Sequence, residues 1–450
     1  MVRFYIVLFI TKFIAKIVNI IDKQKGTNIS GKIAVKLCPD FVAKFKNIDS
    51  DKTVFVTGTD GKTTTTNMIA YVVRESGKKV ATNSEGANLL QGVATTLIKN
   101  SKLSGKFNKE YLILEIDERS LPKVYNVLKA KHLVITNLEK DQVQRNGEPD
   151  YIYKIFEKVI NKDMTIYLNN EEPRSKALER KAGKVVYFGL EKNSKSFEKN
   201  SFYDISIPCP KCSSKIIYEY YNLENIGKFK CINCDHKSED IPDIYVQNIN
   251  YEEKTFTIEE ETYKINNAIA FYIYNYAAIV AICKGLGLKL EDIKQGISSF
   301  KNPQERREII TYKGKNIKYL RMKQENPKTL QNALDTIAED KESKVIFIGL
   351  HKVENFPPYY TNTFYFFDCD FDKVVKSGVE KYISFSDTVA YDCANRIVYA
   401  GEEKDKIEIV ETDNYELVLP ELDKFETTNV YFITGMKAYE EIIKLIKKAK

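Results

Sequence analysis

The sequence predicts an α/β protein built on a parallel sheet that helices cover on both faces. From about residue 50, short β-branched runs alternate with helical patterns, and the runs are apolar throughout rather than at every second residue. A glycine-flanked loop follows the first of these runs, as in nucleotide-binding α/β folds. The length of 450 residues allows two or three domains.

The first half of the chain supplies most of this sheet. Strands are expected at 54–56, 112–116, 132–136, 165–168 and 185–188. A helical pattern covers 64–75, where Gly77 is expected to end the helix, and a second covers 268–285.

A second α/β stretch starts near residue 309. Strands are expected at 345–350 and 430–434, and helices at 328–339 and 438–448. Residues 301–308 (KNPQERRE) are expected to form a hinge before it. We therefore expect a helical arm over 1–48, a central nucleotide-binding domain over 49–300 with an insert at about 203–242, and a C-terminal α/β domain over 309–450.

The charge balance is mildly basic. The formal net charge is +7, from 69 Lys and Arg against 62 Asp and Glu. An enzyme of anionic substrates and a protein with a merely Lys-rich surface both fit this value. Because the basic residues form no arm or stripe and no reading motif accompanies them, we expect no nucleic-acid partner.

Residues 2–21 are predicted to form an amphipathic helix. The run 4–10 is apolar, but Lys12 and Lys16 interrupt the residues after it, and a transmembrane helix needs about 20 apolar residues. A signal peptide is disfavoured, since only Arg3 precedes the run and no small-residue cleavage site comes after it. Two roles remain open: packing on the next domain, or resting on a membrane surface. We expect a cytoplasmic protein, at the inner face of the membrane under the second alternative.

The loop Gly58-Thr59-Asp60-Gly61-Lys62-Thr63, continued by Thr64, is predicted to bind ATP. Backbone N–H groups and the following helix N-terminus would face the phosphates, with Lys62 reaching the terminal ones and the Thr63 hydroxyl holding Mg²⁺. The general Walker pattern requires Gly at position 56, where Val56 stands, so only a shorter pattern is present. The alternative is a chance Gly-Lys-Thr turn, which the strand directly before the loop disfavours.

Carboxylates stand at the end of a second buried strand, in the run 112–118 (LILEIDE). The carboxyl ends of strands in a doubly wound sheet face the ligand crevice. A carboxylate there, close to the phosphate loop, is expected to be a second Mg²⁺ ligand. Mur ligases, whose ATP loop the loop at 58–63 resembles, have a Glu in this place, and the resemblance implies that Glu115 is this ligand and a catalytic residue. Asp117 and Glu118 either join the site or are simply solvated.

Two CxxC pairs predict a structural zinc site at Cys209, Cys212, Cys231 and Cys234. The 18 residues from 213 to 230 separate the pairs, a spacing typical of zinc ribbons with a closed tetrahedral site. His236 is expected to be a bystander. The other cysteines are scattered, which favours a reducing compartment over a disulfide framework; they stand at 38, 283, 369 and 393.

The loop T-G-T-x-G-K-T-T resembles the ATP loop of the Mur ligase family. The resemblance implies a central P-loop domain in which ATP converts a carboxylate to an acyl phosphate that an amine then attacks. It also implies nucleotide contacts for Asn137, Asn275 and Arg306, although Asn275 and Arg306 have a purely structural alternative. Amino-acid-adding members usually have His and Asp after the Asn, where this chain has Gln142, Gln144 and Asn146.

Within that family the chain resembles the MurT-like subunits of lipid II isoglutaminyl synthase. The inserted zinc ribbon with its four cysteines, a short N-terminal helix and a divergent C-terminal domain carry this likeness, with matching segments at 86–88, 114–118, 134–137, 141–142, 326–327 and 368–371. The likeness implies amidation of the D-glutamate α-carboxylate of the lipid II stem peptide. Ammonia would come from a GatD-like class I glutaminase in a heterodimer. The alternatives are a Mur-type ligase for another peptide or polyglutamate, and a catalytically silent nucleotide-binding scaffold.

Asn362 departs from that likeness. MurT-like proteins have an Asp at this position, which completes the Cys-His pair of the partner glutaminase. An Asn accepts a hydrogen bond from an imidazole N–H, as in Cys-His-Asn hydrolases, but lacks the negative charge. The resemblance implies a catalytic role for Asn362 in the partner's site; the alternative is a diverged paralogue with another substrate or partner.

Overall fold

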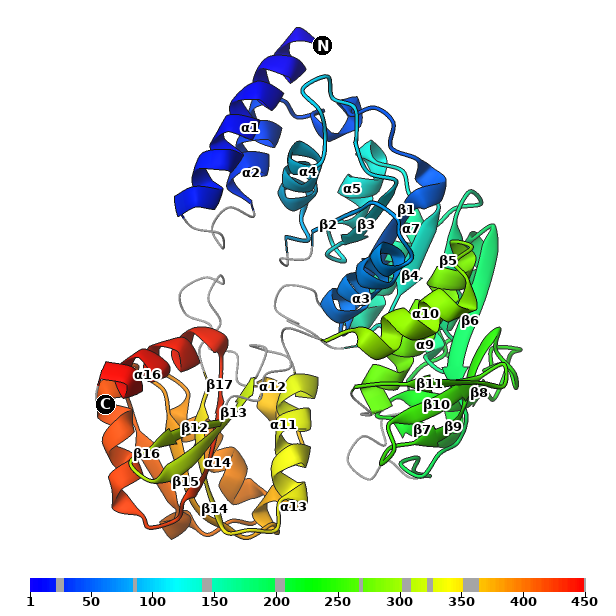
Figure 1. The fold of residues 1–450 in the computed structure, drawn as a ribbon. Coiled ribbons are helices and arrows are strands. Elements are labelled where there is room, and N and C mark those ends of the chain that lie inside the picture. The colour runs from blue at the N-terminus through cyan, green and yellow to red at the C-terminus, as the bar shows by residue number, and fades with distance from the viewer. Residues whose placement is uncertain are drawn as a thin grey trace. The chain divides into compact units, whose positions relative to one another are not determined.

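The computed structural model describes nine stretches of the chain, which form two compact units. The stretches are residues 1–21, 28–83, 87–139, 148–198, 207–266, 270–301, 309–321, 327–350 and 364–448. The first unit comprises residues 1–139 and 148–302, and the second comprises 140–147 and 303–450. Figure 1 shows the elements of each unit.

The first unit is built on a nine-stranded sheet in the order β11-β10-β9-β6-β5-β4-β1-β3-β2. Strands from β2 to β9 pair in parallel, and β9, β10 and β11 pair antiparallel. The bounds are β1 Thr53–Thr57, β2 Val80–Thr82, β3 Tyr111–Glu115, β4 His132–Ile135, β5 Thr165–Asn169, β6 Lys184–Leu190, β9 Ile244–Asn250, β10 Thr255–Ile258 and β11 Glu261–Lys264.

The central strands are buried on both faces, as their continuous apolar runs predicted. Every residue of β1, β3, β4 and β5 is buried. The five strands expected in this part of the chain are confirmed, each end lying within two residues of the predicted one. The antiparallel edge strands were not predicted.

Helices cover the two faces of this sheet and form two separate cores. On one face lie α3 Lys62–Glu75, α9 Ala270–Gly285 and α10 Leu290–Ser299. On the other lie α1 Val2–Ile21, α2 Ile29–Leu37, α4 Leu90–Lys99, α5 Leu121–Val127 and α7 Pro149–Val159. Gly77 follows α3 with a φ of +81°, and Lys78 N donates back to Val73 O at 3.3 Å, so the predicted helix end is confirmed.

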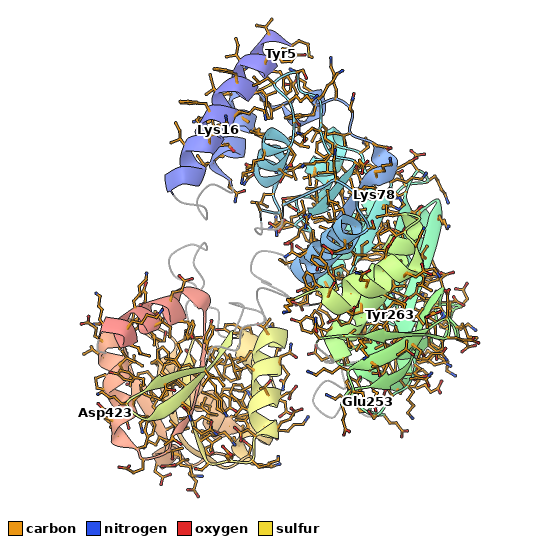
Figure 2. All side chains as sticks on the ribbon, in the orientation of Figure 1. Tyr5, Lys16, Lys78, Glu253, Tyr263 and Asp423 are labelled. Carbon is orange, nitrogen blue, oxygen red and sulfur yellow. The ribbon has the colours of Figure 1, made fainter. Side chains whose placement is uncertain are left out.

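Helix α1 has the bounds predicted for it, and one of its faces packs into the first unit. Phe4, Val7 and Leu8 belong to the same buried core as α4 and the sheet. The Phe4 ring centroid lies 5.1 Å from that of Phe41. Lys16 of this helix, labelled in Figure 2, is exposed. Among the described residues, no helix is long and apolar enough to cross a membrane.

The second unit contains a six-stranded sheet in the order β12-β13-β17-β14-β15-β16. Only the β12–β13 hairpin is antiparallel. The strands are β12 Ile309–Tyr312, β13 Lys315–Arg321, β14 Lys344–Gly349, β15 Val379–Phe385, β16 Ile407–Val410 and β17 Asn429–Thr434. Helices α11 Pro327–Glu339 and α14 Ala390–Tyr399 pack on one face, and α16 Met436–Lys448 packs on the other. The predicted parallel α/β character of this region is confirmed.

A glycine allows α2 to approach α4 closely. A Cβ added at Gly31 would lie 1.8 Å from Gln91 O, and Gly31 N donates to Thr95 Oγ1 at 3.0 Å. We predict that Gly31→Ala lowers the free energy of unfolding of the first unit by about 1–3 kcal/mol, because the helices must separate. Guanidinium unfolding followed by circular dichroism measures this. The control is Lys32→Ala at the exposed neighbouring position; equal stability of the two variants would contradict the close packing.

Candidate nucleotide and metal sites

The loop between β1 and α3 lies at the carboxyl end of the central strand β1, and two glycines give it its shape. Gly58 has a φ of +122° and Gly61 a φ of +80°. A Cβ at Gly58 would lie 2.4 Å from Thr136 Oγ1, and one at Gly61 would lie 2.4 Å from Asn275 Oδ1. Both positions therefore require glycine on two grounds, the left-handed backbone and the close neighbour.

Asn137 fixes the backbone of this loop. Its Oδ1 accepts from Asp60 N at 3.0 Å, its Nδ2 donates to Asp60 O at 3.2 Å, and its own carbonyl accepts from Thr59 N at 2.9 Å. The Thr59 hydroxyl donates to Glu139 O at 3.0 Å. Asn137, predicted as a nucleotide contact, is thus placed where it holds the phosphate loop to the end of β4.

Thr63 and Glu115 bring two oxygen ligands together at the start of α3. Glu115 ends β3 and is 3% exposed, and its Oε2 accepts from Thr63 Oγ1 at 2.7 Å. Two adjacent ligands of an octahedral Mg²⁺ ion lie about 3 Å apart, given metal–oxygen distances of about 2.1 Å. The pair therefore fits Mg²⁺, beside a loop whose backbone and helix N-terminus suit the phosphates of ATP.

Two asparagines orient Glu115, and no sequence motif indicated this role for either of them. Asn88 Nδ2 donates to Glu115 Oε1 at 2.9 Å. Asn83 bonds the Glu115 backbone on both sides, accepting from its N–H at 2.8 Å and donating to its carbonyl at 2.8 Å. The available signals were their position after β2, the strand adjacent to β3 in the sheet, and for Asn88 the family-like segment 86–88.

Lys62 and Glu118 form a buried ion pair. Lys62 Nζ lies 2.6 Å from Glu118 Oε1 and also donates to Thr59 O at 2.8 Å and to Gly58 O. Burial raises the pKa of the Glu118 carboxyl, while the nearby Lys62 charge acts against that rise. The ammonium predicted to reach the phosphates is thus held within the loop.

Asp117 serves the turn between β3 and α5. Its Oδ1 accepts from Arg119 N at 3.1 Å and from Ser120 N at 3.2 Å, just before α5. Asp117 and Glu118 are 5% and 4% exposed. The alternative that these two carboxylates are simply solvated is therefore wrong.

Asn275 on α9 is buried against the phosphate loop. Its Oδ1 would lie 2.4 Å from a Cβ added at Gly61, and its Nδ2 has no hydrogen-bond acceptor among the described residues. A buried amide donor of this kind is satisfied when a ligand supplies an acceptor. The structure thus brings Asn275, Asn137, Glu115 and the loop together. Arg306 and Asn362 lie outside the described residues.

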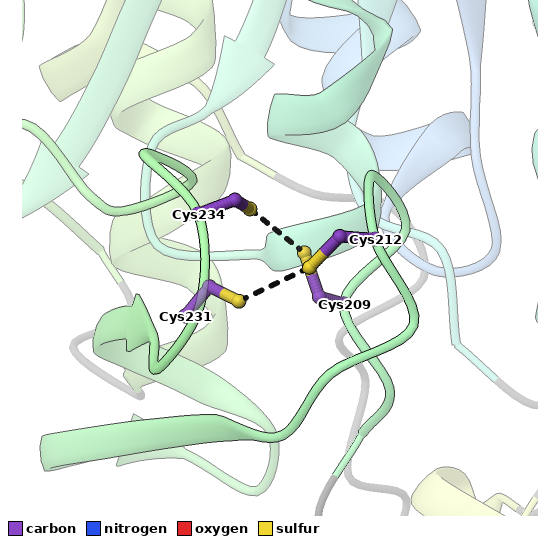
Figure 3. Close-up of side chains that lie close together, drawn as sticks. All are labelled: Cys209, Cys212, Cys231 and Cys234. Carbon is purple, nitrogen blue, oxygen red and sulfur yellow. Dashed lines mark hydrogen bonds between the residues drawn. The ribbon is translucent and has the colours of Figure 1, made fainter.

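The four predicted zinc ligands lie together beside the hairpin of β7 Ile216–Leu223 and β8 Ile226–Cys231 (Figure 3). Cys209 Sγ is 3.6 Å from Cys234 Sγ, and Cys212 Sγ is 3.5 Å from Cys231 Sγ, so neither pair is a disulfide. Zn–S distances of about 2.3 Å in a tetrahedral site place sulfurs about 3.8 Å apart. The cluster therefore fits one zinc ion.

The ribbon has almost no hydrophobic core of its own. Besides Cys209 and Cys231, its buried cluster contains only Ile216 and Phe229. His236 is not among the clustered ligands, since its Nε2 lies 2.8 Å from Pro173 O. A hairpin with so little apolar burial needs a cross-link, which the metal would supply.

A buried glutamate connects the ribbon to α9. Glu171 accepts from Asn222 Nδ2 on β7 at 3.1 Å, from Leu190 N at 2.6 Å, and from the Tyr274 hydroxyl on α9. Burial raises the pKa of Glu171 to about 7. Tyr274 directly precedes Asn275, so the ribbon and the phosphate loop contact neighbouring residues of one helix.

We predict that the purified protein contains about one zinc per chain and that Cys231→Ser loses it, because three thiolates leave the site open. Elemental analysis after dialysis against a weak chelator measures this. Cys393→Ala, which changes a scattered cysteine, and Lys62→Ala should both retain zinc. Full zinc content in Cys231→Ser would contradict the predicted site. Release of zinc by Lys62→Ala would show that the phosphate loop and the ribbon are structurally coupled in a way that we do not predict.

Two family models match the chain. The Mur ligase middle domain matches residues 56–235, which include the phosphate loop, Glu115 and the ribbon cysteines, and the MurT ligase C-terminal domain matches residues 324–438. Among solved structures, a pseudomurein peptide ligase type C from Methanothermus fervidus has a TM-score of 0.65 at 19% identity, covering 92% of this chain and 84% of that one. MurF from Acinetobacter baumannii has a TM-score of 0.60 at 12% identity, covering 92% and 80%. These two likenesses show the Mur ligase fold.

Curated relatives match along nearly the whole chain. The MurT subunit of lipid II isoglutaminyl synthase from Staphylococcus aureus (strain COL) is 29% identical over 409 residues, 89% of this chain and 88% of the relative. The Streptococcus pneumoniae (strain R6) subunit of the same name is 27% identical over 432 residues, 93% and 92%. Mur ligases are ATP-dependent carbon–nitrogen ligases that use Mg²⁺. The chain is a MurT-like member of the Mur ligase family and, as such, a carbon–nitrogen ligase.

Proposed function

We propose that this chain is the ATP-using subunit of an amidotransferase that converts the D-glutamate α-carboxylate of the lipid II stem peptide to D-isoglutamine. The observation that carries the proposal is that relatives named for this activity match through both the nucleotide-site region and the C-terminal domain. The site supports it with a phosphate loop and a paired Thr63 and Glu115 beside it.

ATP, when bound, supplies the phosphoryl group that makes the carboxylate an acyl phosphate, and ammonia then displaces phosphate to give the amide. The chain's own task in such chemistry is positioning and charge stabilisation. Thr63 and Glu115 would hold Mg²⁺, while Asn83 and Asn88 keep the Glu115 carboxylate in place. Lys62 would neutralise phosphate charge after exchanging Glu118 for a phosphate oxygen.

Ammonia as the nucleophile is consistent with the segment after β4, which lacks the His and Asp that amino-acid-adding ligases usually have there. Ligases that add amino acids usually have His and Asp in the segment where this chain has Gln142, Gln144 and Asn146. These three residues lie outside the described ones. Ammonia carries no carboxylate or side chain that such a site would have to orient. A GatD-like class I glutaminase partner would generate ammonia next to the ligase, in a heterodimer.

The acceptor sets the location of the proposed reaction. Lipid II is a lipid-linked precursor, so the enzyme would work in the cytoplasm at the inner face of the membrane.

The ribbon would serve only to hold structure, since four thiolates leave no open position on zinc.

We predict that the purified chain amidates lipid II when given ATP, Mg²⁺ and ammonium, because ammonium bypasses the partner. Mass spectrometry detects the product, since replacing a carboxyl hydroxyl by an amino group lowers the mass. Glu115→Gln should reduce the rate about 100-fold by weakening Mg²⁺ binding. The control is Glu110→Gln, an exposed carboxylate at the opposite end of the same strand, which should keep full activity.

The result separates the candidate functions. Conversion of another peptide or of polyglutamate, but not of lipid II, would favour a different Mur-type ligase. Binding of ATP with no conversion of any of these acceptors would favour a catalytically silent scaffold. Equal rates for Glu115→Gln and wild type would contradict the metal-binding role of Glu115.

We also predict that Asn362 completes the active site of the partner glutaminase as a neutral hydrogen-bond acceptor. In a pull-down with the native glutaminase candidate, wild type and Asn362→Asp should both bind. Asn362→Asp should alter the glutaminase rate, because the added negative charge stabilises an imidazolium. Loss of binding, or an unchanged glutaminase rate, would show that another residue completes that site.

A further inference from the structure

Helix α1 is apolar on two opposite faces, and the sheet accounts for only one of them. Phe4, Val7, Leu8, Thr11 and Ala15 are buried. Large apolar residues are exposed on the other side: Val2, Ile6, Phe9, Ile10, Phe13 and Ile17. Phe9 and Phe13 are each 63% exposed, far more than a helix buried in a core would show.

The exposed residues form a continuous stripe. At about 100° of rotation per residue, positions 2, 6, 9, 10, 13 and 17 fall within an arc of about 100° on the helix surface. The buried residues occupy the opposite arc. A stripe of this size is unusual on a soluble protein, where exposed apolar residues are normally scattered, and it marks an interaction surface.

Cations border the stripe, and acidic residues are almost absent from this part of the chain. Residues 1–37 include seven Lys and Arg, at positions 3, 12, 16, 23, 25, 32 and 36, against one acidic residue, Asp22. On the helical projection, Lys16 lies at one edge of the stripe and Arg3 at the other. Lys12, next to Lys16 on that projection, donates to Ile98 O at 2.6 Å and to Ser101 O at 2.5 Å, so its charge faces the protein. Arg3, Lys16, Lys32 and Lys36 are exposed on α1 and α2.

We propose that the exposed stripe of α1 docks on an anionic lipid bilayer, with the helix axis parallel to the membrane surface. An apolar face bordered by Lys and Arg is what an interfacial helix presents: the apolar side chains enter the acyl boundary and the cations meet lipid phosphates. Helix α1 lies on the surface rather than spanning the bilayer, because its opposite face is packed in the protein core.

Charge disfavours a second copy of this chain as the occupant. A symmetric dimer through the stripe would place one cationic border against the other, which costs electrostatic free energy. An anionic bilayer reverses the sign of that interaction. The proposal extends the proposed function, since a lipid-linked acceptor would lie in the same surface, but it is tested without that acceptor.

The test is co-flotation of the full chain with vesicles of phosphatidylcholine containing phosphatidylglycerol, and with vesicles of phosphatidylcholine alone. Wild type should bind the anionic vesicles more tightly, and binding should weaken with added salt. The double variant Phe9→Glu, Phe13→Glu should lose about tenfold or more in affinity. The matched control is Leu417→Glu, Tyr399→Glu, at exposed apolar positions of the second unit, which should bind as wild type.

Charge is tested separately with Lys16→Glu, which should lower affinity for anionic vesicles by roughly fivefold or more, while Lys78→Glu at an exposed site on the same unit should not. Circular dichroism confirms that each variant is folded. The proposal is overturned if wild type does not bind anionic vesicles, or if the Phe9 and Phe13 double variant binds as well as wild type. A wild-type dimer that this double variant converts to a monomer, without vesicle binding, would instead assign the stripe to a second copy.

Amidation of lipid II in detergent distinguishes this proposal from the proposed ligase function. Phe9→Glu, Phe13→Glu should keep the detergent rate, since these residues are remote from the phosphate loop in sequence and belong to neither proposed metal site. Vesicle binding without amidation would leave the membrane proposal standing and defeat the ligase one. Amidation without vesicle binding would do the reverse.

Discussion

The close approach of two backbone segments to the phosphate loop is the constraint on which the first unit depends. The loop runs between the end of β4, where Asn137 bonds its backbone, and α9, where Asn275 contacts Gly61. Only glycine fits at positions 58 and 61, because any side chain would meet Thr136 or Asn275. The order β4-β1-β3 in the sheet then places Glu115 on the other side of the loop, within reach of Thr63. The proposed metal ligands and the proposed phosphate-binding backbone thus come from one arrangement of three parallel strands.

In the candidate nucleotide site, the opposite charges of the buried Lys62 and Glu118 neutralise each other. An unpaired buried charge costs several kcal/mol, so each side chain stabilises the other where water is excluded. Nucleotide phosphates would offer Lys62 a stronger, more highly charged partner. Glu118 would then lose its counterion in a place where burial already raises the pKa of its carboxyl. Lys62, the proposed phosphate ligand, therefore also neutralises a carboxylate beside the loop.

The parts of the site that were predictable from the sequence are those set by local structure. The phosphate loop stands directly between a strand and a helix in the sequence, and Glu115 ends a buried strand. The loop and Glu115 could therefore both be placed from the sequence alone. The partners of Glu115 and Lys62 could not be placed in this way. Asn83 and Asn88 reach Glu115 only because β2 pairs with β3 in a particular register, and Glu118 lies 56 residues from Lys62 in the chain. The edge strands β10 and β11 were missed because their residues alternate between buried and less buried, unlike the continuous central strands.

The ribbon and the N-terminal helix show how added elements are joined to a sheet whose centre is occupied by the nucleotide site. The ribbon meets the sheet at Glu171, directly after β5, where a buried carboxylate accepts bonds from β7, from the end of β6 and from α9. These hydrogen bonds tie the ribbon hairpin and α9 to one buried carboxyl group and so favour one arrangement of the two. Because Tyr274 and Asn275 are neighbours, that arrangement also sets the position of the asparagine against Gly61. Helix α1 joins the opposite face through Phe4, Val7 and Leu8 and leaves its second apolar face exposed. A helix that only closed the core would not need that second face, so packing on the sheet explains the buried half of its sequence, and the proposed bilayer contact would explain the exposed half.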